Sequence, residues 1–462
     1  MQMNKLLVGM DSLFDTSLKT ELKWQENRYR NVNFNCGNLV YNNRSEVSGV
    51  YARVCKNGMY GSAATSECSE EKVKEVLKAA SNNALFMDRH AKRNDYKSIV
   101  VPNGTIALNR PIIDTEQKKI IDVCRQVDEY IVKNYPNLKS RYVGYNEESM
   151  EKELLVSEGK SGHTTVPRCN LYVGMTAETK DGTPVELGVN TGGYGCFDDY
   201  YSKLDEVYKK VDELYIKVMA KSEGVRAEAG YKTVILGGIL GGMLSHEAVG
   251  HTVEADLVKN GSVAGPSLGK MVASEMVNLV DFAHTFNGET APLPVYLDDE
   301  GVEAKDAVII KDGKLVGYMN NKELAAYYDM EPTGNARGWE YMHDPIIRMR
   351  NTTILPGQDK LEEMIASVDD GYYLLETNNG QADLTGEFMF GVTFGYEIKK
   401  GKLGRAILDT TVSGMAFDML KTVDMISDKV YWCTSGMCGK GQAMMVAMGG
   451  PEIRCKIMLG GN

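Results

Sequence analysis

Apolar residues recur at helical spacing in three stretches of the first half of the chain. Residues 70–80 place apolar side chains three or four positions apart, and residues 117–135 and 204–220 repeat this spacing. Such a pattern is typical of a helix that buries one face and exposes the other. We therefore predict three amphipathic helices, each packed against a core in the ordinary way.

Turn dipeptides between apolar segments predict hairpins in both halves of the chain. Residues 49–54 alternate small or apolar with polar positions and are followed by Asn57-Gly58, a strong signal for a two-residue hairpin turn. Residues 140–180 are interpreted as short strands that end at a turn at Asp181-Gly182. The second half is predicted to contain hairpins at 308–319 and 396–407, around Asp312-Gly313 and Lys400-Gly401, and short helices at 320–328 and 360–368.

These elements predict an α+β fold in two domains. Charge and glycine at residues 222–230 indicate a boundary, so we expect a mixed α+β N-terminal domain at 1–225 and a β-rich domain at 226–462. The second domain would carry one central helix after the apolar run 234–244. Because no flexible linker separates the halves, we expect the N-terminal domain to pack tightly on the C-terminal one.

Composition excludes several classes of protein. The 462 residues are 43% apolar and 25% charged, which is typical of a globular protein with more than one core. A net charge of −11 argues against nucleic acid or an anionic membrane as the main partner. The longest apolar stretch, 234–244, contains four glycines and is far shorter than the ~20 residues of a membrane-spanning helix.

The N-terminal residues and the cysteines bear on the cellular compartment. The first ten residues lack the three regions of a signal peptide. The nine cysteines are scattered and odd in number, which suits a reducing compartment better than a disulfide framework. We therefore expect a cytoplasmic protein.

Candidate catalytic and metal-binding residues are concentrated in residues 245–251, Ser-His-Glu-Ala-Val-Gly-His. His246 and His251 supply two nitrogen ligands, and Glu247 supplies a carboxylate next to the first of them. Two imidazoles and an adjacent glutamate are the parts of a zinc hydrolase, in which the carboxylate acts as the base for an activated water. The ordinary alternative is a buried helix with two hydrogen-bonded histidines and a glutamate at its surface.

The spacing of the two histidines is unusual for such a site. They stand five positions apart rather than four, and on a regular helix at ~100° per residue they would point about 140° apart. One extra residue is accommodated by a π-bulge, a feature common at functional sites. Gly250 would tolerate the distorted backbone. We predict a locally unwound or π-bulged helix at 247–251.

A third ligand must come from elsewhere, because catalytic zinc usually has three protein ligands. Cys438 is a candidate, since it stands in Ser-Gly-Met-Cys-Gly-Lys-Gly-Gln. There the glycines leave the thiol unshielded and Lys440 would favour the thiolate. A separate metal site with Cys433 and Cys438 as paired ligands has weaker support, because the sequence offers no second pair to complete four ligands. The glycine run at 237–242 lacks the spacing of a nucleotide-binding loop, so close packing is its expected role.

Several motifs, taken in order, resemble the TldD/PmbA family, and in particular its metallopeptidase (TldD) branch. His246 to His251 matches the His-Glu-x-x-x-His of that branch, and Glu254 and Asp256 match its Glu-x-Asp continuation. Further similar segments are Asp298-Asp299-Glu300-Gly301, Thr333 to Arg337, Arg348 to Thr352, Leu355-Pro356-Gly357 and Cys438-Gly439-Lys440. The likeness covers nearly the whole chain and is strongest from about 230 to 450. Departures include Gly338, where the family often has arginine, and a segment after Cys438 that is one residue shorter.

The resemblance implies a zinc-dependent peptidase that acts on unfolded or short peptides. Zinc would be held by His246 and His251 on a central metal-binding helix and by Cys438 from a separate segment. Glu247 would be the general base. The family also implies a dimer, either of two copies or with a metal-free family member.

The polar residues Arg337, His343, Arg348, Asn351 and Thr352 are predicted to bind substrate or the developing oxyanion. Salt bridges and turn hydrogen bonds are the ordinary alternatives. A rival function is a non-catalytic, peptide-binding or regulatory subunit of a TldD/PmbA-type complex. Such a scaffold has no need of Glu247 beside a metal ligand, and a purely structural zinc would require a fourth protein ligand.

Overall fold

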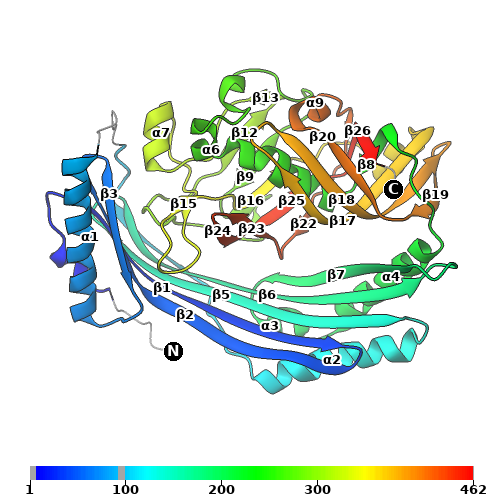
Figure 1. Ribbon diagram of the computed structural model, residues 1–462, viewed down its shortest axis with the longest axis horizontal. Coiled ribbons are helices and arrows are strands. Elements are labelled where there is room, and N and C mark those ends of the chain that lie inside the picture. Colours follow the sequence, from blue (N-terminus) through cyan, green and yellow to red (C-terminus); the bar gives the residue numbers. More distant parts are fainter. Residues whose placement is uncertain (1–6, 92–98, 461–462) are drawn as a thin grey trace.

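The computed structural model describes residues 7–91 and 99–460. The chain forms two layers (Figure 1): a long curved sheet from the N-terminal half lies beneath a compact C-terminal half built around two further sheets. The α+β class and the β-rich C-terminal region are as predicted.

The N-terminal sheet has seven strands in the order β3-β2-β1-β5-β6-β4, with β7 beside β6. Its strands are Lys19–Asn35 (β1), Asn38–Lys56 (β2), Met59–Thr65 (β3), Gly104–Asn109 (β4), Ser140–Val156 (β5), Lys160–Glu178 (β6) and Pro184–Tyr194 (β7). The central strands β1 and β5 pair antiparallel over most of their length. The prediction of short strands at 140–180 was wrong, because β5 and β6 have 17 and 19 residues.

The reason for this error is the distribution of polar residues along β5. Asn146 and Glu148 look like interruptions in the sequence, yet they belong to one face of a continuous strand. Val143 and Tyr145 alternate with them and are buried in the core on the other face. Since successive side chains of a strand point to opposite faces, polar residues at every second position lengthen the strand instead of ending it.

Helices cover the outer face and one end of the sheet (Figure 1). They are Glu70–His90 (α1), Gln117–Asn134 (α2), Phe197–Tyr201 (α3) and Asp205–Ser222 (α4). The three predicted helices are confirmed as α1, α2 and α4. The side chain of Ser69 caps α1 by accepting from the N–H of Lys72, which satisfies one free donor of the first turn. The apolar stripe of α1 is buried against β2 and β3, and those of α2 and α4 form a second core with β1, β5 and β6.

The C-terminal half contains a six-stranded and a seven-stranded sheet. The six-stranded sheet comprises Lys314–Leu315 (β13), Ala307–Lys311 (β12), Leu279–Phe282 (β9), Asn351–Ile354 (β16), Ala447–Gly450 (β25) and Tyr431–Cys433 (β22), in that order. The seven-stranded sheet comprises Asp370–Ala382 (β17), Gly230–Leu236 (β8), Ile453–Gly460 (β26), Thr410–Met415 (β20), Glu387–Lys399 (β18) and Lys402–Ile407 (β19), with Met425–Ile426 (β21) beside β26.

Smaller elements complete this half. Three two-stranded sheets pair Thr285–Phe286 (β10) with Glu289–Thr290 (β11), Ala336–Arg337 (β14) with Ile346–Ile347 (β15), and Met437–Lys440 (β23) with Gln442–Met445 (β24). The helices are Gly238–Met243 (α5), Ala255–Lys259 (α6), Lys322–Tyr328 (α7), Leu361–Ala366 (α8) and Ala416–Leu420 (α9). The short helices predicted at 320–328 and 360–368 are confirmed as α7 and α8.

The predicted hairpin turns at Asn57-Gly58, Asp312-Gly313 and Lys400-Gly401 are also confirmed. Both central residues of each turn have positive φ, from 48° to 82°. This is the geometry of the type I′ turns that match the twist of paired strands.

The segment from α5 to residue 253 lies between the two C-terminal sheets. It packs on β16 and β25 of one sheet and on β17 and β18 of the other, and its apolar residues belong to the largest core. Buried ion pairs join the N-terminal sheet to this half, including Lys23 Nζ to Asp299 Oδ2 at 3.0 Å and Arg53 Nη2 to Glu300 Oε1 at 2.6 Å. We propose that the domain boundary at 225–226 divides the long sheet from the two C-terminal sheets.

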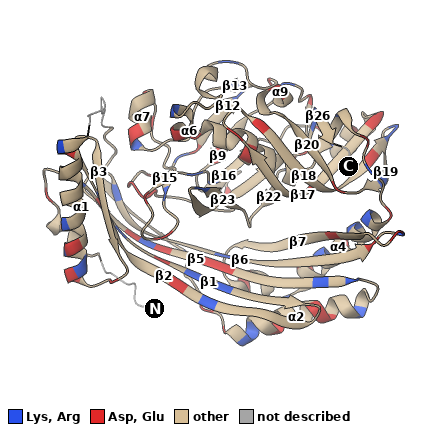
Figure 2. Ribbon diagram, viewed as in Figure 1, with Lys and Arg blue, Asp and Glu red and all other residues tan. Residues whose placement is uncertain are grey.

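Acidic and basic residues are interspersed along the long strands and over the upper layer (Figure 2). Within residues 7–91 and 99–460, no helix combines the length and the apolar character needed to cross a membrane.

Candidate metal centre

The central helix changes its pitch where the two histidines lie. After α5, residues Leu244–Gly250 form a π-helix and His251–Val253 a 3-10 turn. The N–H of His251 donates to the carbonyl oxygen of His246, which is the five-residue hydrogen bond that defines a π-turn. The predicted distortion is confirmed, although it begins earlier, at Leu244. It brings the two imidazole ring centroids to 5.2 Å.

Gly250 is needed for close packing and not for an unusual backbone conformation. Its φ and ψ are −53° and −51°, values open to any residue, so the reason predicted for this glycine was wrong. A Cβ at this position would lie 2.2 Å from Sδ of Met349. Close packing also explains the preceding glycine run, as expected, because a Cβ on Gly242 would lie 3.0 Å from the Cα of Gly449.

Cys438 reaches the histidines from the hairpin of β23 and β24. Its side chain is buried, and its Sγ lies 3.4 Å from Nε2 of His251. One donor atom from each of His246, His251 and Cys438 lies within 4.8 Å of the other two. In the described part of the chain, this is the one group of three or more His, Cys, Asp or Glu side chains whose donor atoms converge in this way.

The surroundings of His246 fit a bound metal. The residue is fully buried, and neither ring nitrogen has a hydrogen-bond partner among the described residues. A buried polar group without a hydrogen-bond partner destabilises the folded state by ~1–3 kcal/mol. A ligand bound to the ring of His246 would remove this penalty. Burial, helped by the nearby charges of His251 and Arg348, lowers the pKa of His246 well below its usual value. The neutral ring is the form that binds metal, and two nitrogens with one sulfur are a typical zinc donor set.

Glu247 lies at the edge of this cluster. Its Oε2 is 3.6 Å from Nε2 of His251, and its Oε1 is 4.0 Å from Nε2 of His246. The side chain keeps 23% of its surface exposed, so the carboxylate borders both the rings and solvent. Burial raises the pKa of Glu247, with Glu254 adding to the rise and His251 opposing it. A raised pKa increases the proton affinity of a carboxylate, as a general base requires.

A chain of charged groups supports the cluster from outside. Glu254 is fully buried, and its Oε2 lies 2.8 Å from Nδ1 of His251. Its Oε1 is 3.3 Å from Nζ of Lys440, which also contacts both carboxylate oxygens of Asp256 at 2.9 and 3.0 Å. The charge of Lys440 is therefore paired with two carboxylates, whereas the sequence predicted that it would stabilise the Cys438 thiolate. Burial alone would lower the pKa of His251, but Cys438 and Glu254 outweigh it and raise this pKa to about 10.

Two of the predicted substrate-binding residues hold the Cys438 hairpin. Arg348 is fully buried and donates to the carbonyl oxygens of Cys438 at 2.8 Å and of Gln442 at 2.7 Å. Arg337 donates to the carbonyl oxygen of Met445 at 3.2 Å. Burial, with the neighbouring positive charge of Arg348, lowers the pKa of Arg337 to about 9.

The other three predicted substrate-binding residues bind within the protein. The side-chain amide of Asn351 donates to the carbonyl oxygens of Phe282 and Leu293 at 2.9 and 2.8 Å. The hydroxyl of Thr352 donates to Oδ1 of Asp281 at 3.0 Å. The ring of His343 accepts from the N–H of Glu340 at 3.1 Å within its own loop. The structure therefore brings the two arginines to the cluster and gives these three local contacts instead.

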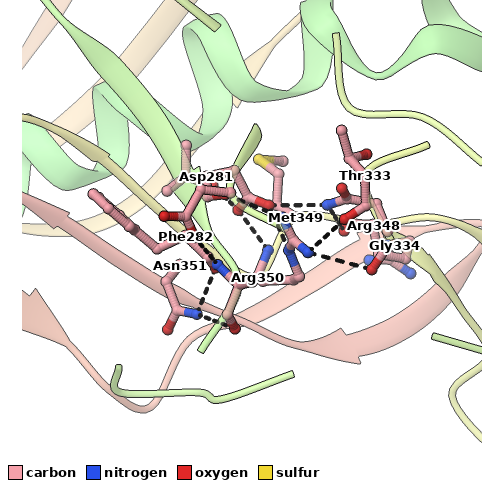
Figure 3. A network of polar contacts seen from close by, with 12 residues as sticks. Asp281, Phe282, Thr333, Gly334, Arg348, Met349, Arg350 and Asn351 are labelled. Atoms are coloured by element: carbon pink, nitrogen blue, oxygen red, sulfur yellow. Dashed lines mark hydrogen bonds and ion pairs between the residues drawn. The ribbon is translucent and has the colours of Figure 1, made fainter. Parts of the chain in front are cut away.

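A buried network beside the cluster was not predicted. Figure 3 shows Arg350 surrounded by carbonyl oxygens and by the carboxylate of Asp281. Its Nε lies 2.8 Å from Oδ2 of Asp281, and its other nitrogens donate to the carbonyl oxygens of Thr333 and Lys305. The network ties β9 and β16 to the loop that leads to Arg337. The sequence signal was a pair of arginines between the strand residues Ile346-Ile347 and Asn351. An arginine buried there needs a carboxylate as its partner.

Comparisons with known proteins identify the family of this chain. Residues 229–461 match the domain described as PmbA/TldA metallopeptidase C-terminal domain, and residues 20–84 match domain 1 of the same proteins. A metalloprotease of Methanocaldococcus jannaschii is 33% identical over 424 residues, covering 88% of this chain and 89% of that protein. A zinc metalloprotease TldD homolog of Saccharolobus solfataricus is 29% identical over 409 residues, covering 88% of each. The chain belongs to the TldD/PmbA family of metallopeptidases.

A solved structure extends the likeness to the fold of the whole chain. TldE from Thermococcus kodakarensis superposes with a TM-score of 0.74 over 99% of both chains at 17% identity. At this identity the similarity concerns the fold alone.

Proposed function

We propose that this chain is a zinc-dependent peptidase in which His246, His251 and Cys438 hold the metal and Glu247 is the general base. One observation carries the proposal. Three donor atoms from two distant segments converge within 4.8 Å, and the two ring nitrogens of His246 have no hydrogen-bond partner among the described residues. Three protein ligands leave a coordination position open for chemistry, as catalytic zinc sites require.

Zinc, when bound, activates a water and polarises the substrate carbonyl. Glu247 accepts the proton of the attacking water at a carboxylate oxygen and then delivers it to the nitrogen of the leaving amine. Its partial exposure lets the carboxylate reach substrate from the solvent side of the rings. Glu254 orients His251 by accepting a hydrogen bond from its Nδ1, which would leave Nε2 free to hold the metal.

Surface exposure separates the predicted substrate-binding residues. Arg348, Asn351 and Thr352 have no exposed surface, so we assign them to support of the site. Arg337 borders a small cavity of ≈ 40 Å³ and His343 is half-buried. We propose these two as the residues that contact substrate.

We also propose that the protein works in the cytoplasm as a dimer, either of two copies or with a metal-free family member. The compartment is supported by the cysteines, all nine of which are free thiols within the described chain. Light scattering on the protein purified from its native host gives the mass of the complex. A monomeric mass at cellular concentration would contradict the dimer.

Metal analysis and one isosteric variant test the peptidase proposal. Protein purified without chelators should contain about one zinc per chain. Glu247→Gln should keep this zinc and lose cleavage of an unstructured peptide by at least about a hundredfold, because general-base catalysis contributes ~10²–10⁴ in rate. Glu275→Gln, an exposed glutamate outside the cluster, is the matched control and should cleave normally. Cleavage by Glu247→Gln at the wild-type rate would end the assignment of the base.

A further inference from the structure

The inner face of the long sheet carries a row of asparagines. Asn43 of β2 pairs with Asn31 of β1, Asn31 pairs with Asn146 of β5, and Asn146 pairs with Asn170 of β6. All four stand in register on adjacent strands, so their side chains share one face. The amide of Asn146 donates to Oδ1 of Asn31 at 2.7 Å. The row thus crosses four strands beneath the C-terminal half.

A cavity of ≈ 320 Å³ lies over one end of this row. The sheet side of the cavity includes Asn146, Asn170 and Asn190, and Ser435 and Met437 line it as well. Met437 directly precedes Cys438, and the hairpin of β23 faces β5 and β6 in Figure 1. The volume falls within the ~300–1,000 Å³ of ligand pockets. The cavity is therefore large enough for a ligand. Since successive side chains of a strand point to opposite faces, Met437 lines the cavity while Cys438 is directed to the metal cluster on the other face of the hairpin.

Polar groups in the cavity wall lack partners. Asn170 keeps only 5% of its surface exposed, and its Oδ1 has no hydrogen-bond partner in residues 7–91 and 99–460. Nε of Arg168, a side chain 2% exposed, is also unpartnered within these ranges. Since buried polar atoms are nearly always hydrogen-bonded, a ligand with donors and acceptors fits this wall.

The two charged residues of the cavity wall, Arg168 and Glu148, neutralise each other, which favours an uncharged ligand. The guanidinium of Arg168 forms an ion pair with Glu148 and donates to the carbonyl oxygen of Gly436 at 2.9 Å. No net charge therefore remains to select an anion or a cation. Each asparagine amide has one acceptor oxygen and two N–H donors, the same groups that a peptide bond presents.

We propose that this cavity binds the main chain of an extended peptide, with Asn146, Asn170 and Asn190 pairing with its N–H and C=O groups. Amide side chains recognise the backbone and not the sequence, and Met437 adapts to different substrate side chains because a methionine is flexible. The site shares strand β23 with Cys438 and would hold a part of the substrate chain outside the metal cluster. The inference rests on the proposed function for the cleavage that follows, but binding can be measured without cleavage.

The test uses zinc-loaded protein carrying Glu247→Gln, so that the probe is not consumed. The probe is a fluorescein-labelled ten-residue peptide of glycine, serine and alanine, and fluorescence anisotropy measures its Kd. Adding Asn170→Leu should raise the Kd about tenfold, which corresponds to one or two lost hydrogen bonds. Adding Asn43→Leu, in the same row but outside the cavity, should change it less than twofold.

Two further measurements keep the result independent of folding. Asn170→Asp has the same shape but fewer donors, so it should also weaken binding, while zinc content and circular dichroism stay normal. A probe with N-methylated peptide bonds should bind the parent protein weakly, and Asn170→Leu should no longer distinguish it from the ordinary probe.

An unchanged Kd in both Asn170 variants, at normal zinc content, would overturn the peptide site while leaving the peptidase proposal intact. Tight binding of the N-methylated probe would overturn it as well. Cleavage of the probe by Glu247→Gln at the wild-type rate would instead refute the assigned base, and the binding comparison would still hold.

Discussion

Lys440→Met removes the cation that links the two segments of the candidate metal centre. Nζ of Lys440 contacts Glu254 on the histidine side at 3.3 Å and both oxygens of Asp256 at 2.9 and 3.0 Å, and the lysine itself belongs to the strand of Cys438. Methionine keeps the length and apolar stem of the side chain. The substitution therefore isolates the charge.

The structure sets the size of the effect. The side chain of Glu254 is 0% exposed and that of Lys440 is 15% exposed, so solvent screens the pair only slightly. Breaking a buried ion pair by removing one partner costs ~3–5 kcal/mol. Glu254 retains its hydrogen bond with His251, which places the expected loss of unfolding free energy near the lower limit, at about 3 kcal/mol. Loss of an outer support for a metal ligand weakens metal affinity by about 10–100-fold.

Competition with a chromophoric chelator measures the zinc Kd, and urea unfolding measures the stability of the metal-free protein. Lys421→Met is the matched control, because its ion pair with Asp418 is exposed at 50% and 75%, and such pairs contribute little. Lys440→Arg retains the charge and should recover part of the affinity. A zinc Kd for Lys440→Met within twofold of wild type would refute the reasoning that this lysine joins the two halves of the site.

Three further substitutions test the packing and electrostatics around the site. Gly250→Ala should destabilise the protein by ~1–3 kcal/mol through overpacking against Met349; an unchanged urea midpoint would contradict this. Arg350→Met should cost ~3–5 kcal/mol in urea unfolding, because it leaves a buried carboxylate unpaired; a loss below ~1 kcal/mol would show that the network is dispensable. Burial, the repulsion of a second lysine and incomplete compensation by Asp299 lower the pKa of Lys152 from 10.5 to about 8. Between these pH values the unfolded state binds a proton at Lys152 that the folded state lacks, so folding becomes more favourable as the pH rises. The unfolding free energy of wild type minus that of Lys152→Met should therefore rise by about 3 kcal/mol over this range. A difference that does not change with pH would contradict the lowered pKa.

Elements with a local signal were predictable from the sequence. The stripe of α1 and the three positive-φ turns depend only on residues close together in the chain, so spacing and turn chemistry were sufficient. The length of β5 was not, because its continuity comes from pairing with β1, whose residues lie more than a hundred positions away. Strand β6 in turn pairs along β5. A single sequence does not contain that register.

The same division applies to the metal centre. The π-turn followed from the five-residue spacing of His246 and His251, which a regular helix cannot bring together. Among nine cysteines, Cys438 was a candidate through its neighbouring glycines and Lys440, and the family resemblance strengthened this choice. Its placement depends on Arg348, which binds the hairpin carbonyls and was predicted to bind substrate instead. Sequence identifies reactive groups more readily than the buried groups that hold them.

Gly250 shows why a correct prediction of geometry does not establish its cause. Glycine beside a distorted helix suggests unusual backbone angles, but the π-turn here uses ordinary right-handed values. The constraint comes from Met349, which precedes the buried Arg350 and is brought against the helix by the network around Asp281. A glycine that is required by a neighbour's side chain tolerates alanine once that neighbour is smaller, whereas a glycine required by its own φ does not. Met349→Ala should therefore relieve the strain of Gly250→Ala, and the coupling of the two substitutions distinguishes the two causes.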